Sequence, residues 1–368
     1  MQVLVCLTGL FDQSGGVQTF NRCLVRSIGN LTAKHGWRVG VLSLNDREIP
    51  QQAKEEFAAA KVEFKGFARH RSSFALESIR MGRRADQVIF GHVNLSPLLL
   101  GMRASGKRPT VYIVLHGTEV WRRLPFLQRT ALLQADQLLS VSHFTETETL
   151  KFNPGVCAER FLWFPDSLEP MGPEAGSNQT RETLNLPSGK MILSVSRLGT
   201  ADRSKGIDQL IEALPSILSE VPDAFYVLVG EGPDRERLQA LVRQKGLVDK
   251  VFFCGAVSGE LLPAYYRTCD VFALPSRQDG FGIVFLEAMQ YAKPCVGYSA
   301  GGVPEVVQDG VTGILSDPGE KGQLKNAVVT LLQDRALSQR MGQAGRDRLT
   351  REFSPAMFEK RLEAALCR

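Results

Sequence analysis

Two series of short apolar runs, separated by a proline-containing segment, constrain the fold of this chain more than any other feature. Within each series the apolar runs alternate with amphipathic stretches, which is the pattern of a parallel sheet whose strands are joined by helices. The first series occupies residues 1–165 and the second residues 189–353. The chain has 368 residues, whereas a single core rarely serves more than about 300. The sequence therefore predicts two α/β domains.

The first series contains five predicted strands, at residues 3–10, 37–44, 87–92, 110–117 and 137–142. A helix is expected after Gly15 and Gly16, because apolar residues recur at spacings of three and four from Val17 to Leu31. Gly36 is expected to end that helix. We therefore expect the first domain to begin with a strand, a glycine turn and a helix.

The second series predicts strands at residues 191–196, 225–230, 251–255, 271–276 and 294–299, and helices at 206–220, 234–246, 259–268 and 282–292. Residues 320–350 and the segment after Ser354 are also expected to be helical. Between the two series, residues 166–188 contain three prolines and several small polar residues. That composition is typical of a linker.

The loop around Gly15 and Gly16 joins a predicted strand to a predicted helix. Backbone N–H groups at a helix N-terminus favour anions, and glycines let a phosphate approach closely. A tight turn without any ligand explains the two glycines equally well. The loop matches neither a Walker loop nor the G-x-G-x-x-G fingerprint, which disfavours ATPase and dehydrogenase functions.

In the second domain, SVSRLGTADRSKGID places Arg197 after a buried strand and Lys205 before the glycine that opens a helix. We expect both cations to converge on one anion, where they would stabilise a departing diphosphate. A solvated pair of loop charges is the simpler alternative.

The most specific stretch is PSRQDGFGIVFLEAMQYAKPCVG, in which Asp279 precedes Gly280, Phe281, Gly282 and Ile283. If a helix starts near Gly282, Glu287 lies on its second turn, and the two carboxylates face one cavity at different depths. Ionised carboxylates accept hydrogen bonds from sugar and ribose hydroxyls. The apolar neighbours of Glu287 make a merely solvated glutamate the weaker interpretation.

His116 stands at the carboxyl end of a predicted strand, where an open α/β sheet exposes residues to its ligand. It is expected to donate a hydrogen bond to a sugar hydroxyl. His143 occupies a similar position and is the competing candidate, and a structural role is the alternative for either histidine.

Together these motifs resemble the retaining glycosyltransferases of family 4. The resemblance covers nearly the whole chain and is carried by SGGVQ, LHGTEVW, ADQLLSVSHFT, SVSRL with KGID, VGEGPD, VFFCG and the block from Pro275 to Leu315. It implies the GT-B fold, in which two Rossmann-like domains face each other across a cleft. The N-terminal domain (1–165) would bind the acceptor and the C-terminal domain (189–353) the nucleotide sugar. Residues 354–368 would form a helix that crosses back to the first domain.

The resemblance also implies roles for individual residues. Gly15 and Gly16 would approach the diphosphate, Arg197 and Lys205 would neutralise it, and Glu287 would hold the ribose. Asp279 and His116 would contact the transferred sugar, and the segment around Val257 would line the base pocket. The donor site would include the backbone of Gly280, Phe281, Gly282 and Ile283. The family normally has two glutamates separated by seven residues, so Asp279 is one methylene shorter than expected.

The expected activity is transfer of a hexose from a UDP- or GDP-sugar to a glycan, glycolipid or small-molecule acceptor. Same-face attack, with the leaving phosphate as base, is favoured over double displacement, and no metal or other cofactor is expected. One alternative is a nucleotide-sugar 2-epimerase of the same fold, although no dedicated acid and base pair stands out. Another is a non-catalytic nucleotide-sugar binding protein, suggested by the shortened Asp279.

Charge divides unevenly along the chain. Residues 1–165 hold 21 Lys and Arg against 13 Asp and Glu, and the remainder holds 23 against 26. The basic residues of the first part gather in two clusters, at Arg69, Arg71, Arg80, Arg83 and Arg84 and at Arg103, Lys107, Arg108, Arg122 and Arg123. We expect them to contact an anionic membrane or acceptor, unless they are only solvated faces. Nucleic acid is not expected, because no binding motif accompanies them.

The seven cysteines are scattered and never spaced as C-x-x-C, so neither a disulfide framework nor a zinc site is predicted. A reduced cytosol fits this usage. No run of about 18 apolar residues occurs, and the first residues lack the basic start of a signal peptide. We expect a cytoplasmic protein that makes peripheral contact with the inner face of the membrane.

Overall fold

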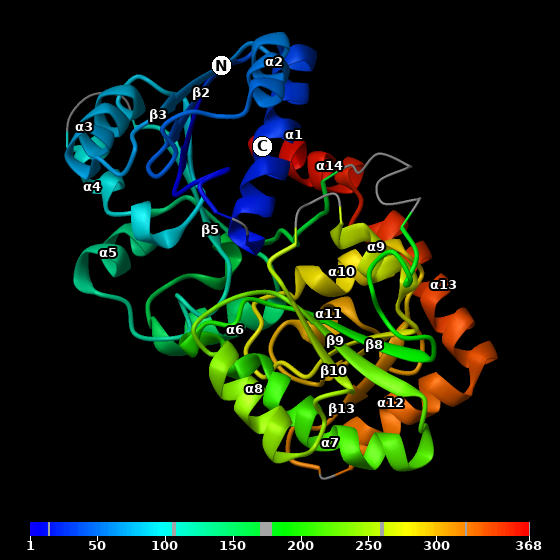
Figure 1. Cartoon of the computed structure of the whole chain (residues 1–368). Coiled ribbons are helices and arrows are strands. Elements are labelled where there is room, and N and C mark those ends of the chain that lie inside the picture. Colours follow the sequence, from blue (N-terminus) through cyan, green and yellow to red (C-terminus); the bar gives the residue numbers. More distant parts are fainter. Residues whose placement is uncertain (14, 105–107, 170–178, 258–260, 321, 368) are drawn as a thin grey trace. The chain divides into compact units, whose positions relative to one another are not determined.

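The computed structural model describes residues 1–13, 15–104, 108–169, 179–257, 261–320 and 322–367. The chain forms two compact units, which are coloured along the sequence in Figure 1. The first comprises residues 1–169 together with 353–368, and the second comprises residues 170–352. Each is described by itself below.

The first unit is a seven-stranded parallel sheet with helices between its strands. Its strands are β1 (Gln2–Leu7), β2 (Arg38–Ser43), β3 (Val62–Gly66), β4 (Gln87–Phe90), β5 (Thr110–Leu115), β6 (Gln137–Ser140) and β7 (Phe161–Trp163). Its helices are α1 (Gly16–His35), α2 (Gln51–Ala59), α3 (Arg71–Gly82), α4 (Leu98–Arg103), α5 (Phe126–Gln134), α6 (His143–Phe152) and α14 (Pro355–Leu366), with short 3-10 turns η1 (Val93–Leu95) and η2 (Ala158–Arg160). The strand order is β3-β2-β1-β4-β5-β6-β7.

The second unit is a six-stranded parallel sheet. Its strands are β8 (Lys190–Val195), β9 (Ala224–Val229), β10 (Val251–Gly255), β11 (Val271–Leu274), β12 (Cys295–Tyr298) and β13 (Gly313–Ser316). Its helices are α7 (Ile207–Glu220), α8 (Arg235–Gln244), α9 (Leu262–Thr268), α10 (Ile283–Gln290), α11 (Val303–Val306), α12 (Gln323–Gln333) and α13 (Arg335–Glu352), with the 3-10 turn η3 (Thr200–Lys205). The strand order is β10-β9-β8-β11-β12-β13.

The ten predicted strands and the first helix are confirmed. Gly36 ends α1 in the left-handed conformation, which glycine adopts at little cost. Three strands were missed, namely β3, β7 and β13, and all three lie at an edge of their sheet. The strands that could be predicted are mostly buried. The central strand β1 is buried from Val3 to Leu7, whereas in β3 buried or partly buried residues alternate with exposed ones. The segment expected to be helical, residues 320–350, contains α12 and most of α13.

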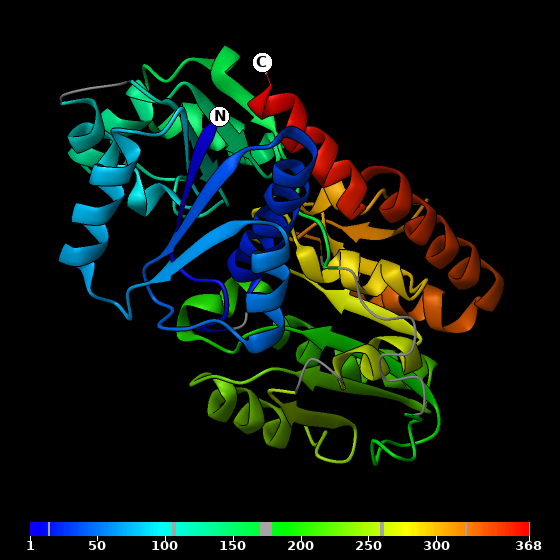
Figure 2. The same ribbon diagram turned by 90° about the horizontal axis from the view of Figure 1, so that it is seen from above.

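The end of the chain belongs to the first unit. Helix α14 packs beside α1, where Asn30 donates to Glu359 (2.6 Å) and Lys34 pairs with Glu363 (2.7 Å). The two helices lie side by side in Figures 1 and 2. The predicted linker begins too early, because Ser167 is buried in the first unit and its hydroxyl donates to the carbonyl of Phe353 (2.7 Å).

Each sheet has one point at which its strand order reverses. In the first unit this point lies between β1 and β4, and in the second between β8 and β11. All strand pairs are parallel, so the loops after these neighbouring strands leave from the same edge of the sheet. Such a reversal leaves a crevice at the carboxyl ends of the strands, where open α/β sheets bind ligands.

Candidate functional site

The reversal point of the second unit gathers two of the predicted residues. The loop after β8 continues into η3, whose last residue is Lys205, and the loop after β11 carries Asp279. The Lys205 ammonium forms an ion pair with Oδ1 of Asp279. The Asp279 residue is buried, at 7% exposure, and the Lys205 side chain is partly buried. The structure thus brings these two predicted residues together, and their shared role in binding a donor stays a prediction.

Asp279 keeps one acceptor without a donor. Its Oδ2 atom is buried and has no hydrogen-bond partner among the described residues. An ionised carboxylate has about four lone-pair positions, and leaving a buried one unsatisfied costs roughly 1–3 kcal/mol. Asp279 is therefore equipped to accept a hydrogen bond from a ligand.

Arg197 does not join this pair. Its side chain is 68% exposed, and its guanidinium lies 3.3 Å from Oδ1 of Asp202. The expected convergence of Arg197 and Lys205 on one anion is thus not seen in the described structure. The reason is local: the loop supplies its own carboxylate to Arg197, whereas the Lys205 ammonium pairs across the reversal point.

Close backbone contacts fix the positions of these loops. A Cβ atom on Gly206 would lie 2.2 Å from the carbonyl oxygen of Pro275, and Gly206 has a φ of +73°. A Cβ on Gly302 would lie 2.2 Å from the carbonyl oxygen of Gly280, and the Gly302 amide donates to the carbonyl of Asp279 (2.7 Å). Only glycine permits such approaches. The loops after β8, β11 and β12 are therefore locked together.

The residues after Asp279 form the turn into α10. Gly282 adopts the left-handed conformation (φ +101°) and Ile283 begins the helix, close to the predicted start. Phe281 is buried at 2% exposure, and Gly280 and Ile283 are partly buried. This turn places the loop backbone next to Asp279.

Glu287 lies on the second turn of α10, as predicted, but among other partners. Its Oε2 accepts a hydrogen bond from the Tyr266 hydroxyl (2.5 Å), and no contact with Asp279 is seen in the described residues. Burial raises the pKa of Glu287 to about 7, while the Tyr266 hydrogen bond opposes that shift. Near neutral pH this carboxyl is therefore only partly ionised, and its expected contact with the ribose stays a prediction. Tyr266 itself was missed, because a tyrosine on an apolar helix reads as core.

Val257 is partly buried and follows β10. The next residues, 258–260, lie outside the described part of the chain. Its predicted place in a base pocket stays a prediction.

In the first unit, Gly16 begins α1 and Gly15 precedes it. Gly16 is exposed and Gly15 is partly buried, so this backbone is accessible at the end of β1. Among the described residues, no side-chain hydrogen bond caps the helix start. The predicted anion contact stays a prediction, although the local geometry leaves room for it.

His116 follows β5 and is partly buried. Its Nε2 lies 2.8 Å from the carbonyl oxygen of Gly91, and its backbone amide donates to Glu119 (2.6 Å). Since a carbonyl only accepts, Nε2 carries the proton and Nδ1 remains an acceptor. In this neutral form the ring has an acceptor, Nδ1, and no second N–H with which to make the hydrogen bond that we expected it to donate.

His92 was missed as a neighbour of His116. It follows β4, and the two rings stack with centroids 5.8 Å apart. Burial lowers the pKa of His116 and lowers that of His92 to about 4, while the charge of Glu119 opposes both shifts. Both histidines are neutral near pH 7. The clue in the sequence was the position of His92 at the end of a predicted strand.

The competing candidate, His143, is the first residue of α6. Its side chain is 66% exposed, and its ring stacks on Trp163 with centroids 5.7 Å apart. The ring of His143 thus contacts Trp163, whereas that of His116 contacts His92, and the choice between the two candidates stays a prediction.

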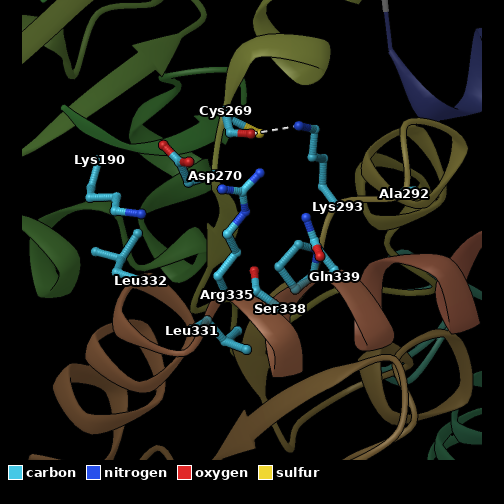
Figure 3. A pocket seen from close by; sticks show the side chains of 11 residues that line it. Lys190, Cys269, Asp270, Ala292, Lys293, Leu331, Leu332, Arg335, Ser338 and Gln339 are labelled. Atoms are coloured by element: carbon cyan, nitrogen blue, oxygen red, sulfur yellow. Dashed lines mark hydrogen bonds between the residues drawn. The ribbon is translucent and has the colours of Figure 1, made fainter. Parts of the chain in front are cut away.

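A separate cavity of about 320 Å³ lies at the opposite, amino-terminal edge of the second sheet. Figure 3 shows Lys190, Lys293 and Arg335 around it, with Lys293 donating to the carbonyl of Cys269 (2.7 Å). Asp270, also in its wall, pairs with Arg181 (2.7 Å). None of the predicted site residues lines this cavity.

Among the described residues, no group of three or more His, Cys, Asp or Glu side chains is arranged to hold a metal ion. All seven cysteines are unpaired. Within the same residues, no helix combines the length and apolar character that crossing a membrane requires.

Comparison with known proteins gives concordant results. The family model of glycosyl transferases group 1 matches residues 177–348. The GDP-mannose-dependent alpha-(1-6)-phosphatidylinositol monomannoside mannosyltransferase of Mycolicibacterium smegmatis is 33% identical over 293 residues, which cover 74% of this chain and 71% of that protein. The protein of the same name from Mycobacterium tuberculosis (strain H37Rv) is 35% identical over 260 residues, covering 65% of this chain and 64% of that one.

Solved structures resemble the chain over its whole length. Anabaena HepE in complex with UDP and glucose has a TM-score of 0.80 at 19% identity, covering 100% of this chain and 99% of that one. Sucrose-phosphate synthase from Thermosynechococcus elongatus has a TM-score of 0.78 at 20% identity, covering 100% and 98%. At these identities the likeness concerns the fold alone.

Proposed function

We propose that this chain, which belongs to the family 4-like group 1 glycosyltransferases and has the GT-B fold, transfers a hexose from a nucleotide diphosphate sugar with retention of anomeric configuration. The observation that carries this proposal is the Lys205–Asp279 pair at the strand reversal of the second unit. This pair places a cation beside an oxygen that can accept a hydrogen bond. A nucleotide-sugar donor requires both, because its diphosphate is negatively charged and its sugar carries hydroxyl groups.

The proposed reaction breaks the bond between the anomeric carbon and the β-phosphate oxygen. The bonding electrons go to the phosphate, and the acceptor hydroxyl attacks the same face of the sugar. The proton of that hydroxyl passes to the leaving phosphate, so no protein base or metal is required. Lys205 stabilises the growing negative charge, and Arg197 contributes after turning from Asp202, which its exposure permits.

We assign the remaining roles as follows. Oδ2 of Asp279 accepts from a hydroxyl of the transferred sugar, and the loop Gly280–Ile283 supplies the adjacent backbone. Glu287 holds the ribose, and Val257 belongs to the base pocket. In the first unit, Gly15 and Gly16 contact the diphosphate, and Nδ1 of His116 accepts from a sugar hydroxyl. The unsatisfied Oδ2 of Asp279 and the fixed tautomer of His116 support these assignments.

For the donor we propose a GDP-sugar, with GDP-mannose the first to test and UDP-sugars the alternative. For the acceptor we propose a lipid-linked polyol or glycan at the cytoplasmic face of the membrane. Support comes from the named activity of the relatives from Mycolicibacterium smegmatis and Mycobacterium tuberculosis, which concerns GDP-mannose and a phosphatidylinositol mannoside.

Calorimetric titration with GDP and with UDP tests the site and identifies the base. Binding of one nucleotide in the presence of EDTA, and its loss in Lys205→Met, is the expected result. Lys205→Met is compared with Arg203→Met, a neighbour in η3 whose guanidinium pairs with Asp234 instead. If the wild type binds neither nucleotide, the proposal is wrong.

A transfer assay with labelled GDP-mannose and extracted membrane lipids then separates the remaining alternatives. Proton NMR of the product should show the same anomeric configuration as the donor. Turnover of the nucleotide sugar without an acceptor would indicate a 2-epimerase. Tight nucleotide binding without transfer to any acceptor, in the wild type and in Asp279→Glu, would indicate a binding protein.

A further inference from the structure

The segment after β5 presents an apolar and cationic surface. Between Arg122 and Leu127 only Leu124 is buried (5% exposed). Phe126 is 80% exposed and Leu127 55%, and they are consecutive residues in the first turn of α5. Helix α5 lies at the periphery of the first unit (Figure 1). We call residues 122–127 the α5 surface.

The backbone of the α5 surface is firmly held. Asn153, which is fully buried, accepts from the Leu124 amide through Oδ1 (2.9 Å) and donates to the carbonyl of Arg122 through Nδ2 (3.1 Å). Arg129 of α5 donates to the carbonyl of Pro154 (2.7 Å). The exposed apolar side chains therefore stand on a pinned scaffold, so exposing them is a property of the folded state and not of a loose loop.

Its arginines carry uncompensated charge. Three other members of the predicted basic clusters are engaged within the unit: Arg80 pairs with Glu77 (2.7 Å), Arg83 donates to the carbonyl of Gly101 (3.0 Å), and Arg103 pairs with Asp136 (2.6 Å). Arg69, Arg71, Arg84 and Arg108 are exposed, and no ion pair joins them to a described residue. Arg122 and Arg123 are exposed and form no ion pair with any described residue. Lys107, another member, lies outside the described residues.

We propose that the α5 surface docks the first unit on an anionic membrane, with Phe126 and Leu127 entering the headgroup and acyl boundary and Arg122 and Arg123 contacting lipid phosphates. Apolar side chains flanked by arginines are the chemistry of an interfacial membrane site. A protein partner fits less well, because a stable protein interface buries about 800 Å² on each side, far more than two side chains offer.

The position of the α5 surface relates it to the proposed reaction. It follows His116 on the same connection between β5 and α5. A lipid-linked acceptor in the membrane would thereby be brought to the end of β5, where His116 stands. This role rests on the proposed function, whereas membrane binding itself does not require that the chain transfer a sugar.

Vesicle flotation of the full chain tests the proposal, using phosphatidylcholine alone or mixed with phosphatidylglycerol, without any nucleotide. Wild type should float with the mixed vesicles and much less with phosphatidylcholine. The double variant Phe126→Ser/Leu127→Ser should lower the partition coefficient by about tenfold or more. Arg122→Gln/Arg123→Gln should lower it by about fivefold per arginine, and only on the anionic vesicles.

Two matched controls accompany these variants. Leu76→Ser removes another exposed apolar side chain of the first unit (72% exposed), and Arg340→Gln/Arg346→Gln removes two exposed charges from α13. Both should float like wild type, and thermal unfolding should show that all variants are folded. If the α5 variants float as well as wild type, or if wild type does not float, the proposal is overturned.

Size-exclusion chromatography with light scattering distinguishes a second copy of the chain as the partner. If the Phe126→Ser/Leu127→Ser variant changes the oligomeric state while flotation is unaffected, the surface joins protein copies and not lipid. Failure of nucleotide binding with intact flotation would reject the proposed function but retain this inference. An α5 variant is expected to lose flotation while it still transfers sugar to a water-soluble acceptor.

Discussion

Lys205 and Asp279 form an ion pair that joins the loop after β8 to the loop after β11. The two residues are far apart in the sequence. They come into contact because the strand order reverses between β8 and β11, which makes these two strands neighbours. The pair holds Lys205 in place before any donor is bound. Such preorganisation lowers the cost of stabilising charge in the transition state.

Replacing Lys205 by methionine should lower the rate of transfer by about 100-fold or more, since one preorganised donor is worth that much. The measurement is kcat with saturating donor, compared with Arg203→Met. Arg203 shares the η3 turn but pairs with Asp234, so its loss should change kcat by only about twofold. Equal losses in both variants would mean that the turn as a whole, and not the Lys205 charge, matters.

Arg197 should exchange its partner when the donor binds. Asp202→Asn weakens the present contact and should therefore raise nucleotide affinity slightly, by a factor of about two, because an exposed ion pair is worth less than about 1 kcal/mol. Arg197→Met should lower kcat by about 100-fold while leaving stability unchanged. Calorimetry and steady-state kinetics measure the two effects. An Arg197→Met enzyme with normal kcat would remove this arginine from the site.

Glu287 should make stability depend on pH. Burial raises its pKa to about 7 from an ordinary value of 4.5, so the folded chain keeps this proton to higher pH than the unfolded chain. The stabilisation is complete below pH 4.5 and is lost as the pH rises to about 7. The glutamine of Glu287→Gln cannot ionise. The free energy of unfolding of this variant, relative to that of wild type, should therefore increase by about 2–3 kcal/mol as the pH rises across this interval.

Urea unfolding at the two ends of this pH interval measures the effect of Glu287. Glu212→Gln is the control, because Glu212 is an exposed carboxylate on α7 of the same unit. Its free energy of unfolding should differ from that of wild type by a constant amount. A pH-independent difference for Glu287→Gln would show that this carboxyl titrates normally in the folded chain.

Gly206 should tolerate no side chain. Gly206→Ala places a Cβ 2.2 Å from the carbonyl of Pro275, so the loop must shift and Lys205 with it. Gly246→Ala is matched, because Gly246 has a similar φ of +67° but nothing within 4 Å of the added Cβ. Backbone strain should lower the free energy of unfolding of both variants by about 1 kcal/mol. Gly206→Ala should lose about 2 kcal/mol more, and it should also lose nucleotide binding. Urea unfolding and calorimetry test this, and similar losses in the two variants would contradict it.

Much of the fold follows from local patterns. The central strands are continuous apolar runs because both of their faces are buried, and so β1, β8 and β11 are predictable. Edge strands such as β3 and β13 have weaker patterns, because part of each is exposed. Asp279, Gly282 and Glu287 are found in the sequence because their spacing around a helix start is distinctive.

The sequence by itself determined the two α/β units, the helix starts at Gly16 and Ile283, and the set of charged residues near strand ends, because these depend on neighbours along the chain. Only the tertiary structure decided which charges meet. Lys205 pairs with Asp279, but Arg197 turns to Asp202, and Glu287 accepts a hydrogen bond from Tyr266. Ion pairing and desolvation depend on distances across strands, and no spacing along the chain specifies those distances.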